Sequence, residues 1–309
     1  MPAELAAGRG AVRRTPHEEA RAAGWLVGPA LLLVGLVAGV PVVLAFVESL
    51  YVHDLRAPWL GRPFVAFDHY RDAFADPRFL AALAHTLFFT FVTVLLELTL
   101  GLALALALHA RLPGRGLART AALLPWALPT VVAAMVWRFL FDGPSSLANQ
   151  AWLLAGGAEP VAWLTHPQLA WVPLILADVW KTTPFVMLLL LAGLQSIDET
   201  LLEAARVDGA GAWQRLWHVT LPLLWPVLSV ALLFRAVDAL RVFDLVYVLT
   251  GGGPGTATEP VGLYTFSVLL QHLRFGYGSA LSVIVFLLAL LLAWPALRIL
   301  VPGSSRSRS

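Results

Sequence analysis

The sequence contains no cysteine and only one lysine. The absence of cysteine excludes disulfide bonds, thiolate metal sites and cysteine nucleophiles together. The single lysine, Lys181, follows Trp180, and no glycine-rich run precedes it. A Walker A loop requires the spacing G-x-x-x-x-G-K-[ST], in which the lysine reaches the phosphates of the nucleotide, so this chain cannot bind ATP in that way.

Charged residues are also scarce, at 13% of the 309 residues, whereas soluble domains carry about 25%. Apolar residues reach 59%, above the usual share of about 45–50%, and the mean hydropathy is +0.77. This apolar excess is larger than the core of a soluble protein can absorb. The composition therefore indicates a membrane protein with several spans.

Six apolar segments are long enough to cross about 30 Å of hydrocarbon, which takes roughly 20 helical residues. They are Trp25–Leu50, His85–Leu108, Leu117–Phe141, Gln168–Leu194, Pro222–Thr250 and Ser279–Val301. Prolines interrupt the third and fourth segments, which neighbouring helices can accommodate. We therefore predict an all-α integral membrane protein with six transmembrane helices.

The first segment resembles a signal peptide because basic residues precede it. Its apolar stretch from Leu26 to Val47 has 22 residues, however, whereas a signal h-region has roughly 7–15, so we expect an uncleaved span. With the N-terminus inside, the inner flanks hold twelve basic residues and the outer flanks five. The positive-inside rule then predicts that both termini are cytoplasmic.

No loop is long enough to form a separate domain, because the longest has 34 residues and unaided folding requires about 40. No internal repeat supports an inverted-repeat carrier. The expected organisation is a cytoplasmic tail 1–24, a first transmembrane helix 25–50, an external loop 51–84, a five-helix core 85–301 that includes a cytoplasmic loop 195–221, and a cytoplasmic tail 302–309.

The loop between the fourth and fifth spans has a helical pattern. Ser196 and Glu199 have the spacing of a capping box, which predicts a helix start. Gly209 is placed to end this short helix in the left-handed conformation. A second short helix is expected at Ala212–Val219, and Pro222 is expected to open the next span at a position where a missing amide costs nothing.

The charges of this loop suggest what it contacts. An interfacial helix that anchors to lipid headgroups is usually rich in lysine and arginine. Here acidic residues outnumber basic residues, which favours docking into a protein groove. The acidic residues are Asp198, Glu199, Glu203 and Asp208, and the basic residues are Arg206 and Arg215.

The spacing within this loop matches a known pattern. Glu203-Ala204-Ala205, Gly209 after three further residues, and Val219-Thr220-Leu221-Pro222 after nine more resemble the EAA loop of ATP-binding-cassette (ABC) importer permeases, E-A-A-x3-G-x9-I-x-L-P. Only Val219, in place of isoleucine, departs from it. Leu124-Pro125-Trp126, Thr250-Gly251-Gly252-Gly253-Pro254 and Phe275-Gly276-Tyr277-Gly278 resemble maltose-type permeases. The segments 179–185 and 233–244 are most similar to trehalose-uptake permease subunits.

The resemblance implies a MetI-like type I importer permease with a cytoplasmic EAA coupling helix in a prokaryotic inner membrane. It implies four kinds of partner: a second homologous permease, two ABC ATPase subunits, an external sugar-binding lipoprotein or periplasmic protein, and membrane lipid, but no nucleic acid. ATP and magnesium would belong to the ATPases, so this chain would hold no cofactor, metal or catalytic residue and would not be an enzyme. The residues implied in ATPase coupling are Glu203, Ala204, Ala205, Arg206, Asp208, Gly209, Arg215 and Pro222.

The implied substrate is a disaccharide or oligosaccharide such as trehalose or maltose, and the alternative is glycerol phosphate or another small polyol. Charged residues at membrane depth usually face a cavity or a partner. Glu97 in the second span and Lys181 in the fourth would pair at mid-membrane, unless Glu97 is protonated and packed. The tentative substrate path comprises Glu97, Trp126, Lys181, Thr182, Asp238, Arg241 and Asp244.

The fifth span carries Arg235, Asp238, Arg241 and Asp244 at successive i,i+3 spacing. They form either a self-neutralising ladder or, through Asp238 and Arg241, part of the sugar path. Two other classes remain as rivals. An ion-coupled secondary transporter would use Glu97 and Asp238 as proton carriers, and an intramembrane enzyme lacks any nucleophile–base or metal constellation in this sequence.

Overall fold

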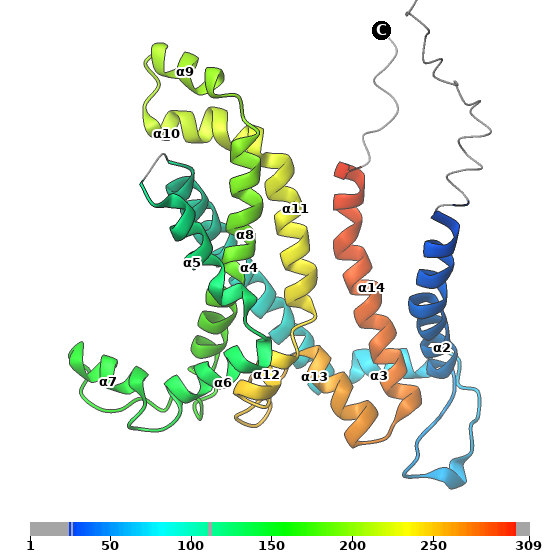
Figure 1. Cartoon of the computed structure of the whole chain (residues 1–309). Coiled ribbons are helices and arrows are strands. Elements are labelled where there is room, and N and C mark those ends of the chain that lie inside the picture. Colours follow the sequence, from blue (N-terminus) through cyan, green and yellow to red (C-terminus); the bar gives the residue numbers. More distant parts are fainter. Residues whose placement is uncertain (1–24, 26, 111–112, 301–309) are drawn as a thin grey trace, which may run out of the picture.

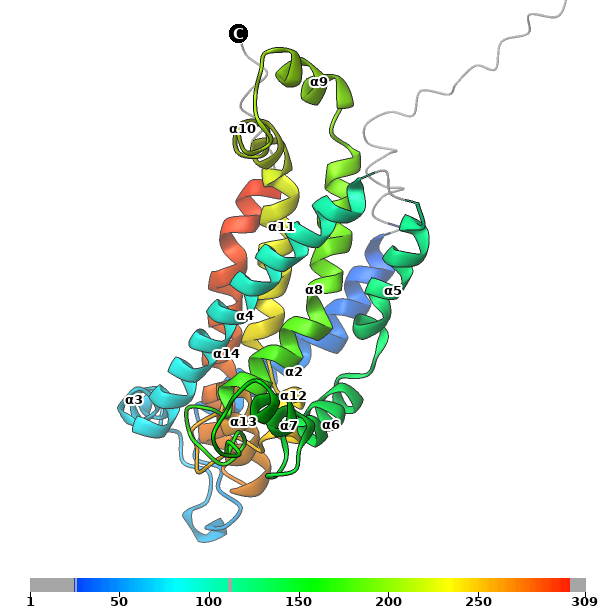
Figure 2. The same ribbon diagram turned by 90° about the vertical axis from the view of Figure 1, so that its left-hand side faces the viewer.

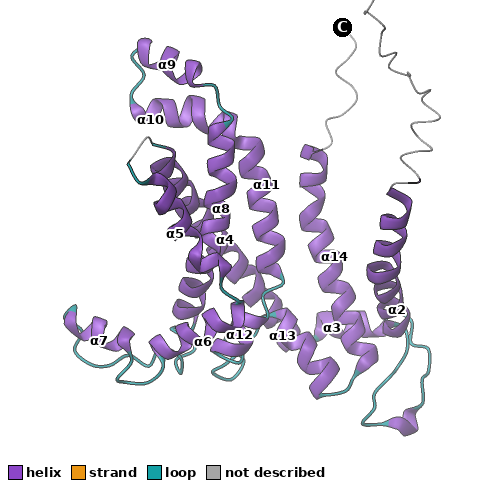
Figure 3. Cartoon of the chain, in the orientation of Figure 1, coloured by secondary structure: helices purple, strands orange, loops and turns teal. Residues whose placement is uncertain are grey.

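The computed structural model describes residues 25, 27–110 and 113–300, of which 295–300 are described by backbone alone. Within these ranges the chain is helical and forms no strand beyond two isolated bridges (Figure 3). The predicted tails 1–24 and 302–309 lie outside the described residues. In the described part of the chain, five helices are long and apolar enough to cross a membrane, or six if one bent pair is a single span.

Three helices form the centre of the bundle: α4 (Pro77–His109), α8 (Trp171–Gln195) and α11 (Leu221–Leu240) (Figure 1). Glycines let them approach closely. A Cβ on Gly101 of α4 would lie 2.6 Å from Cγ1 of Val186 on α8. A Cβ on Gly193 of α8 would lie 2.7 Å from Cδ1 of Leu224 on α11. Small residues at such crossings are typical of helix packing in membranes.

The two outer helices lie beside this centre. The first span, Val27–Ser49, includes a π-helical turn at Gly35–Gly39 and α2 (Val40–Ser49). It packs against α14 (Phe275–Leu300), which also contacts α11. The predicted first and sixth spans are therefore confirmed as helices, although α14 begins at Phe275, four residues before the predicted start.

The second span begins eight residues earlier than predicted. Asp76 caps α4 by accepting a hydrogen bond from the amide of Arg78 at 2.9 Å, and Pro77 occupies a first-turn position, where proline is favoured. The expected loop 51–84 therefore ends at residue 76. It contains α3 (Asp68–Ala75) and a short 3-10 turn at Pro58–Leu60.

The third predicted span is not one straight helix. It consists of α5 (Arg115–Ala127) and α6 (Thr130–Phe141), which meet at an angle of 90°. Pro129 cannot donate an amide hydrogen bond, so the helix breaks there. As a result α6 lies across one end of the bundle, beside α7 (Leu147–Leu154) (Figure 1).

The fifth predicted span is displaced toward the N-terminus. Its helix runs continuously from Ala212 to Leu240 through α10 (Ala212–Arg215), a π-helical turn (Leu216–Thr220) and α11. It ends ten residues before the predicted limit. The chain then forms α12 (Asp244–Leu249), which packs against α6, and later α13 (Val261–Phe266) with a π-helical turn at Ser267–Gln271.

Candidate functional site

The segment between α8 and α11 projects from one end of the bundle as α9 (Glu199–Val207) and α10 (Figure 2). We call residues 198–215 the knob. Its first helix is capped by Asp198, whose carboxylate accepts from the amide of Thr200 at 2.9 Å. Hydrogen bonding to Thr200 lowers the pKa of Asp198. The predicted capping box at Ser196 is wrong, because Ser196 is the C-cap residue of α8 and its hydroxyl donates to the carbonyl of Gly193.

The predicted stop at Gly209 is confirmed. Gly209 has φ +81°, and its amide donates to the carbonyl of Arg206 at 3.0 Å. The next amide, of Ala210, reaches back to the carbonyl of Ala205 at 2.9 Å. Together these bonds form a Schellman motif. Arg215 donates to the carbonyl of Ala210 at 2.6 Å, so its guanidinium group holds the turn between α9 and α10.

Of the remaining predicted coupling residues, Ala205 is half-buried and the others lie at the surface. Glu203, Ala204, Arg206 and Asp208 are exposed, and Val207 beside them is 89% exposed. Leu201 and Trp213 of the knob are exposed as well, at 48% and 71%, and a group of exposed apolar side chains among charged ones suits contact with a protein surface. Pro222 is exposed as well, but it lies within the continuous helix and does not open it.

A cluster of charged side chains lies at the level where α4, α8 and α11 meet. We call Glu97, Asp178, Arg235 and Asp238 the charge cluster. Glu97 is fully buried. Arg235 donates to its two carboxylate oxygens through Nε at 2.5 Å and through Nη2 at 2.8 Å. The predicted Glu97–Lys181 pair is therefore wrong, because Arg235 lies on the face of α11 that is directed at Glu97.

Arg235 also bonds to two further carboxylates. Its Nη2 donates to Oδ2 of Asp178 at 3.2 Å, and its Nη1 donates to Asp238. Thr182 of α8 donates to Glu97 from the other side. Sequence reasoning missed Asp178, although an acidic residue within a predicted span is itself a signal for a functional or paired group.

A small polar pocket of about 130 Å³ opens beside the charge cluster. It lies between α8, the end of α11 and the start of α12, with Thr130 of α6 at its edge. Five charged residues line it: Asp178, Lys181, Asp238, Arg241 and Asp244. Thr182 lines it too. Six of the seven predicted path residues thus lie in or next to this pocket.

Trp126 is the exception. Its ring stacks on that of Phe185, with centroids 5.8 Å apart, and it does not line the polar pocket. The predicted ladder on the fifth span is also only partly present. Arg235 pairs with Asp238, but the helix ends at Leu240 and α12 begins at Asp244. Arg241 and Asp244 therefore do not continue the i,i+3 row.

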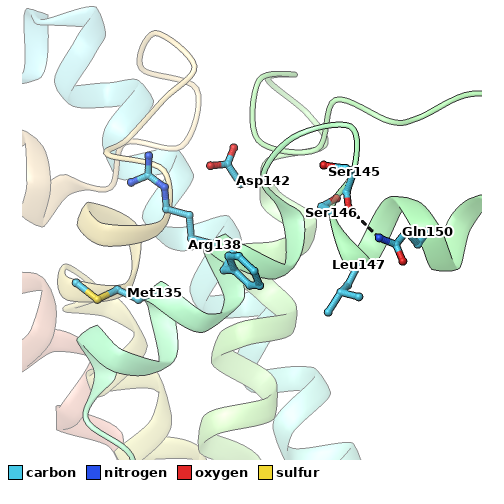
Figure 4. Close-up of a pocket in the computed structure, with 8 residues that line it drawn as sticks. Met135, Arg138, Asp142, Ser145, Ser146, Leu147 and Gln150 are labelled. Carbon is cyan, nitrogen blue, oxygen red and sulfur yellow. Dashed lines mark hydrogen bonds between the residues drawn. The ribbon is translucent and has the colours of Figure 1, made fainter.

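A larger pocket of about 630 Å³ lies at the end of the bundle opposite the knob, between α6 and α7. Figure 4 shows Arg138 and Asp142 on one side of it and Ser145, Ser146 and Gln150 on the other. Arg138 donates to the carbonyl of Val248 at 3.1 Å, which ties α6 to the end of α12. The break at Pro129 places Arg138 here at the end of the bundle, whereas the prediction placed it within a span.

The start of α4 also carries an ionised contact. Asp76 accepts hydrogen bonds from the hydroxyls of Tyr264 at 2.5 Å and Tyr277 at 3.0 Å. Burial alone would raise the pKa of Asp76, but these hydroxyls and the amide of Arg78 lower it below its usual value. Among the described residues, no group of three or more histidine or carboxylate side chains is arranged to hold a metal ion.

Comparison of the sequence with known proteins gives one family match and two relatives. The family described as binding-protein-dependent transport system inner membrane component matches residues 97–302. The chain is 44% identical over 275 residues to the trehalose/maltose transport system permease protein MalF of Thermococcus litoralis, covering 89% of this chain and 92% of that protein. It is 42% identical to the trehalose transport system permease protein SugA of Mycobacterium tuberculosis, covering 87% and 85%.

One finding concerns structure. A chain of a bacterial alginate ABC transporter, crystallised in complex with an alginate pentasaccharide-bound periplasmic protein, superposes with a TM-score of 0.75. The match covers 90% of this chain and 94% of that chain at 23% sequence identity. At this level of identity the likeness concerns the fold, which agrees with the helical arrangement described above.

Proposed function

Because this chain belongs to the family of binding-protein-dependent transport system inner membrane components and is the permease subunit of an ABC importer, we propose that it carries a trehalose- or maltose-like disaccharide. A second, homologous permease would complete the path across the prokaryotic inner membrane. The relatives named for trehalose and maltose transport cover most of the chain at more than 40% identity, which supports this substrate class. Permeases of this kind are not themselves enzymes.

The polar pocket is the observation that carries the proposal, as the part of the sugar path that this chain supplies. Its volume of about 130 Å³ is below the roughly 300–1,000 Å³ of a complete ligand pocket, so the second permease would complete it. Its carboxylates accept hydrogen bonds and its lysine and arginine donate them, which suits a ligand covered with hydroxyl groups. Three carboxylates and two basic groups line the pocket, and Glu97 and Arg235 behind it neutralise each other. The excess of negative charge favours a neutral sugar over glycerol phosphate.

The knob would supply the contact with the ATPase subunits. It projects beyond the bundle, it presents Glu203 and Val207 to solvent, and it joins the two helices that flank the polar pocket. In this arrangement the knob and both termini face the cytoplasm, and ATP and magnesium are bound by the ATPases. The end that carries α6 and α7 would face the external binding protein. The free energy that the knob can transmit equals the difference in its interaction free energy with the ATPases between two states of the transporter.

The test is uptake of labelled trehalose by vesicles that contain the complete transporter and its binding protein. We expect unlabelled trehalose or maltose to compete and glycerol phosphate not to compete. Asp238→Asn and Lys181→Gln should lower uptake, whereas Arg115→Gln at the exposed start of α5 should not. Competition by glycerol phosphate alone would refute the assignment to sugars, and normal uptake in both pocket variants would refute the role of the pocket.

A further inference from the structure

The charge cluster joins three helices through one side chain. Arg235 is 3% exposed and bonds to Glu97 of α4, Asp178 of α8 and Asp238 of its own helix. Asp238 stays 73% exposed, but burying Glu97, Asp178 and Arg235 requires removing their water, and replacing a buried ion pair by apolar residues is often neutral or stabilising. Apolar packing already holds α4 against α8 at Gly101. Stability alone therefore does not account for the cluster, and its position is more informative.

The cluster lies between the knob and the polar pocket. Two helices connect the knob to the cluster. The C-terminal end of α8 leads into the knob, and a continuous helix from Ala212 to Leu240, which includes α11, leads out of it. Trp213 in the knob and Arg235 are about 33 Å apart along this helix at ~1.5 Å per residue. Beyond Arg235, Asp238 and Arg241 follow directly as part of the pocket wall.

Helices α8 and α11 are fastened to each other at two levels. Near the knob, Gly193 lies so close to α11 that a Cβ there would be 2.7 Å from Leu224 and 3.0 Å from Val227. At the level of the pocket, Asp178 bonds to Arg235 at 3.2 Å. Two helices joined at two separated points move as one body, whereas helices joined at one point can pivot about it.

We propose that Arg235 is a positioning residue that couples the knob to the polar pocket. This assignment rests on the proposed transport function. It means that Arg235 fastens α11 to α8 and α4 at the end of α11 that is remote from the knob. Movement of the knob then displaces the pocket wall with it. Without the cluster, α11 bends or pivots near Gly193, and the ATPases work without opening or closing the pocket.

The test compares Arg235→Gln and Arg235→Lys in the full transporter with its ATPases and binding protein. The readout is the number of sugar molecules imported per ATP hydrolysed by transporter that is purified as the intact complex, so that unassembled ATPase subunits do not contribute to the ratio. We expect this ratio to fall in Arg235→Gln by about 5- to 150-fold, the usual range of coupling between sites. Arg235→Lys keeps the charge but cannot reach three carboxylates at once, so its ratio should lie between those of Arg235→Gln and the wild type. Arg115→Gln is the matched control.

The possible outcomes are distinct. A reduced ratio in an assembled Arg235→Gln transporter, with partial recovery in Arg235→Lys, supports the assignment. An unchanged ratio in either variant overturns it. If Arg235→Gln does not assemble, Arg235→Lys decides, and failure of both to assemble overturns the assignment because Arg235 then serves folding alone. Absence of sugar uptake in the wild-type transporter would refute the proposed function instead.

Discussion

Replacement of Gly209 by alanine tests whether the turn of the knob depends on its backbone conformation. Gly209 has φ +81°, and no atom lies within 4 Å of the place a Cβ would occupy. A methyl group therefore meets no obstacle, but the left-handed conformation costs a residue with a Cβ about 1–2 kcal/mol. At 1.4 kcal/mol per tenfold change, Gly209→Ala should shift the turn away from the docked geometry by about 5- to 30-fold.

Asparagine at the same position separates conformation from size. It is larger than alanine, yet it tolerates the left-handed region because its side chain can hydrogen-bond locally. We expect Gly209→Asn to stay close to the wild type. Gly116 in α5 is the control, because a Cβ there would also meet open space and its φ is ordinary. Gly116→Ala should therefore leave the affinity for the ATPase subunits unchanged.

The assay is the affinity of the solubilised permease pair for its ATPase subunits, followed by ATP-driven uptake with the ATPases at a limiting concentration. The order of affinity should be wild type, then Gly209→Asn, then Gly209→Ala. If Gly209→Asn binds more weakly than Gly209→Ala, side-chain volume decides the interaction and the conformational reasoning is refuted.

Three further changes test other parts of the structure. Gly101→Ala should destabilise the chain by about 1–3 kcal/mol, because its Cβ would overlap Val186; a lower thermal unfolding midpoint that Val186→Ala partly restores would verify this. Glu203→Lys should abolish ATP-driven uptake while the chain still inserts, since it reverses a charge on the exposed face of the knob; normal uptake would exclude that face from docking. Tyr264→Phe removes a donor to Asp76 and should cost about 1 kcal/mol after solvent screening. Because the pKa of Asp76 is lowered in the folded state, this difference should be full above about pH 4 and should narrow as the pH falls through the lowered pKa; a constant difference in unfolding midpoint would contradict it.

The spans could be predicted from the sequence because apolar length is a local property of the chain. The predicted spans are wrong where the chain changes direction without a change in hydropathy. The segment after Leu240 stays largely apolar, so its hydropathy predicts a fifth span that continues over α12, although the chain turns between α11 and α12. Likewise Pro129 signalled an interruption, but the 90° angle between α5 and α6 depends on packing that the sequence does not display.

The knob could be predicted from local sequence signals, whereas the charge cluster depends on contacts between distant parts of the chain. Gly209 could be assigned because a glycine after a short amphipathic helix is a local signal. The partner of Glu97 could not be assigned, because Arg235 lies 138 residues away and depth in the membrane does not reveal which face of a helix points at another. Pairing Glu97 with Lys181 on depth alone therefore chose the wrong helix.

The central claim, that this permease imports a sugar through ATPases docked on its knob, is tested most directly by uptake of labelled trehalose into reconstituted vesicles. The vesicles contain this chain, its permease partner, the ATPases and the binding protein, and are supplied either with ATP or with a proton gradient. We predict uptake with ATP, none with the gradient alone, and none with ATP when Glu203 is replaced by lysine. Uptake driven by the proton gradient in the absence of ATP would contradict it.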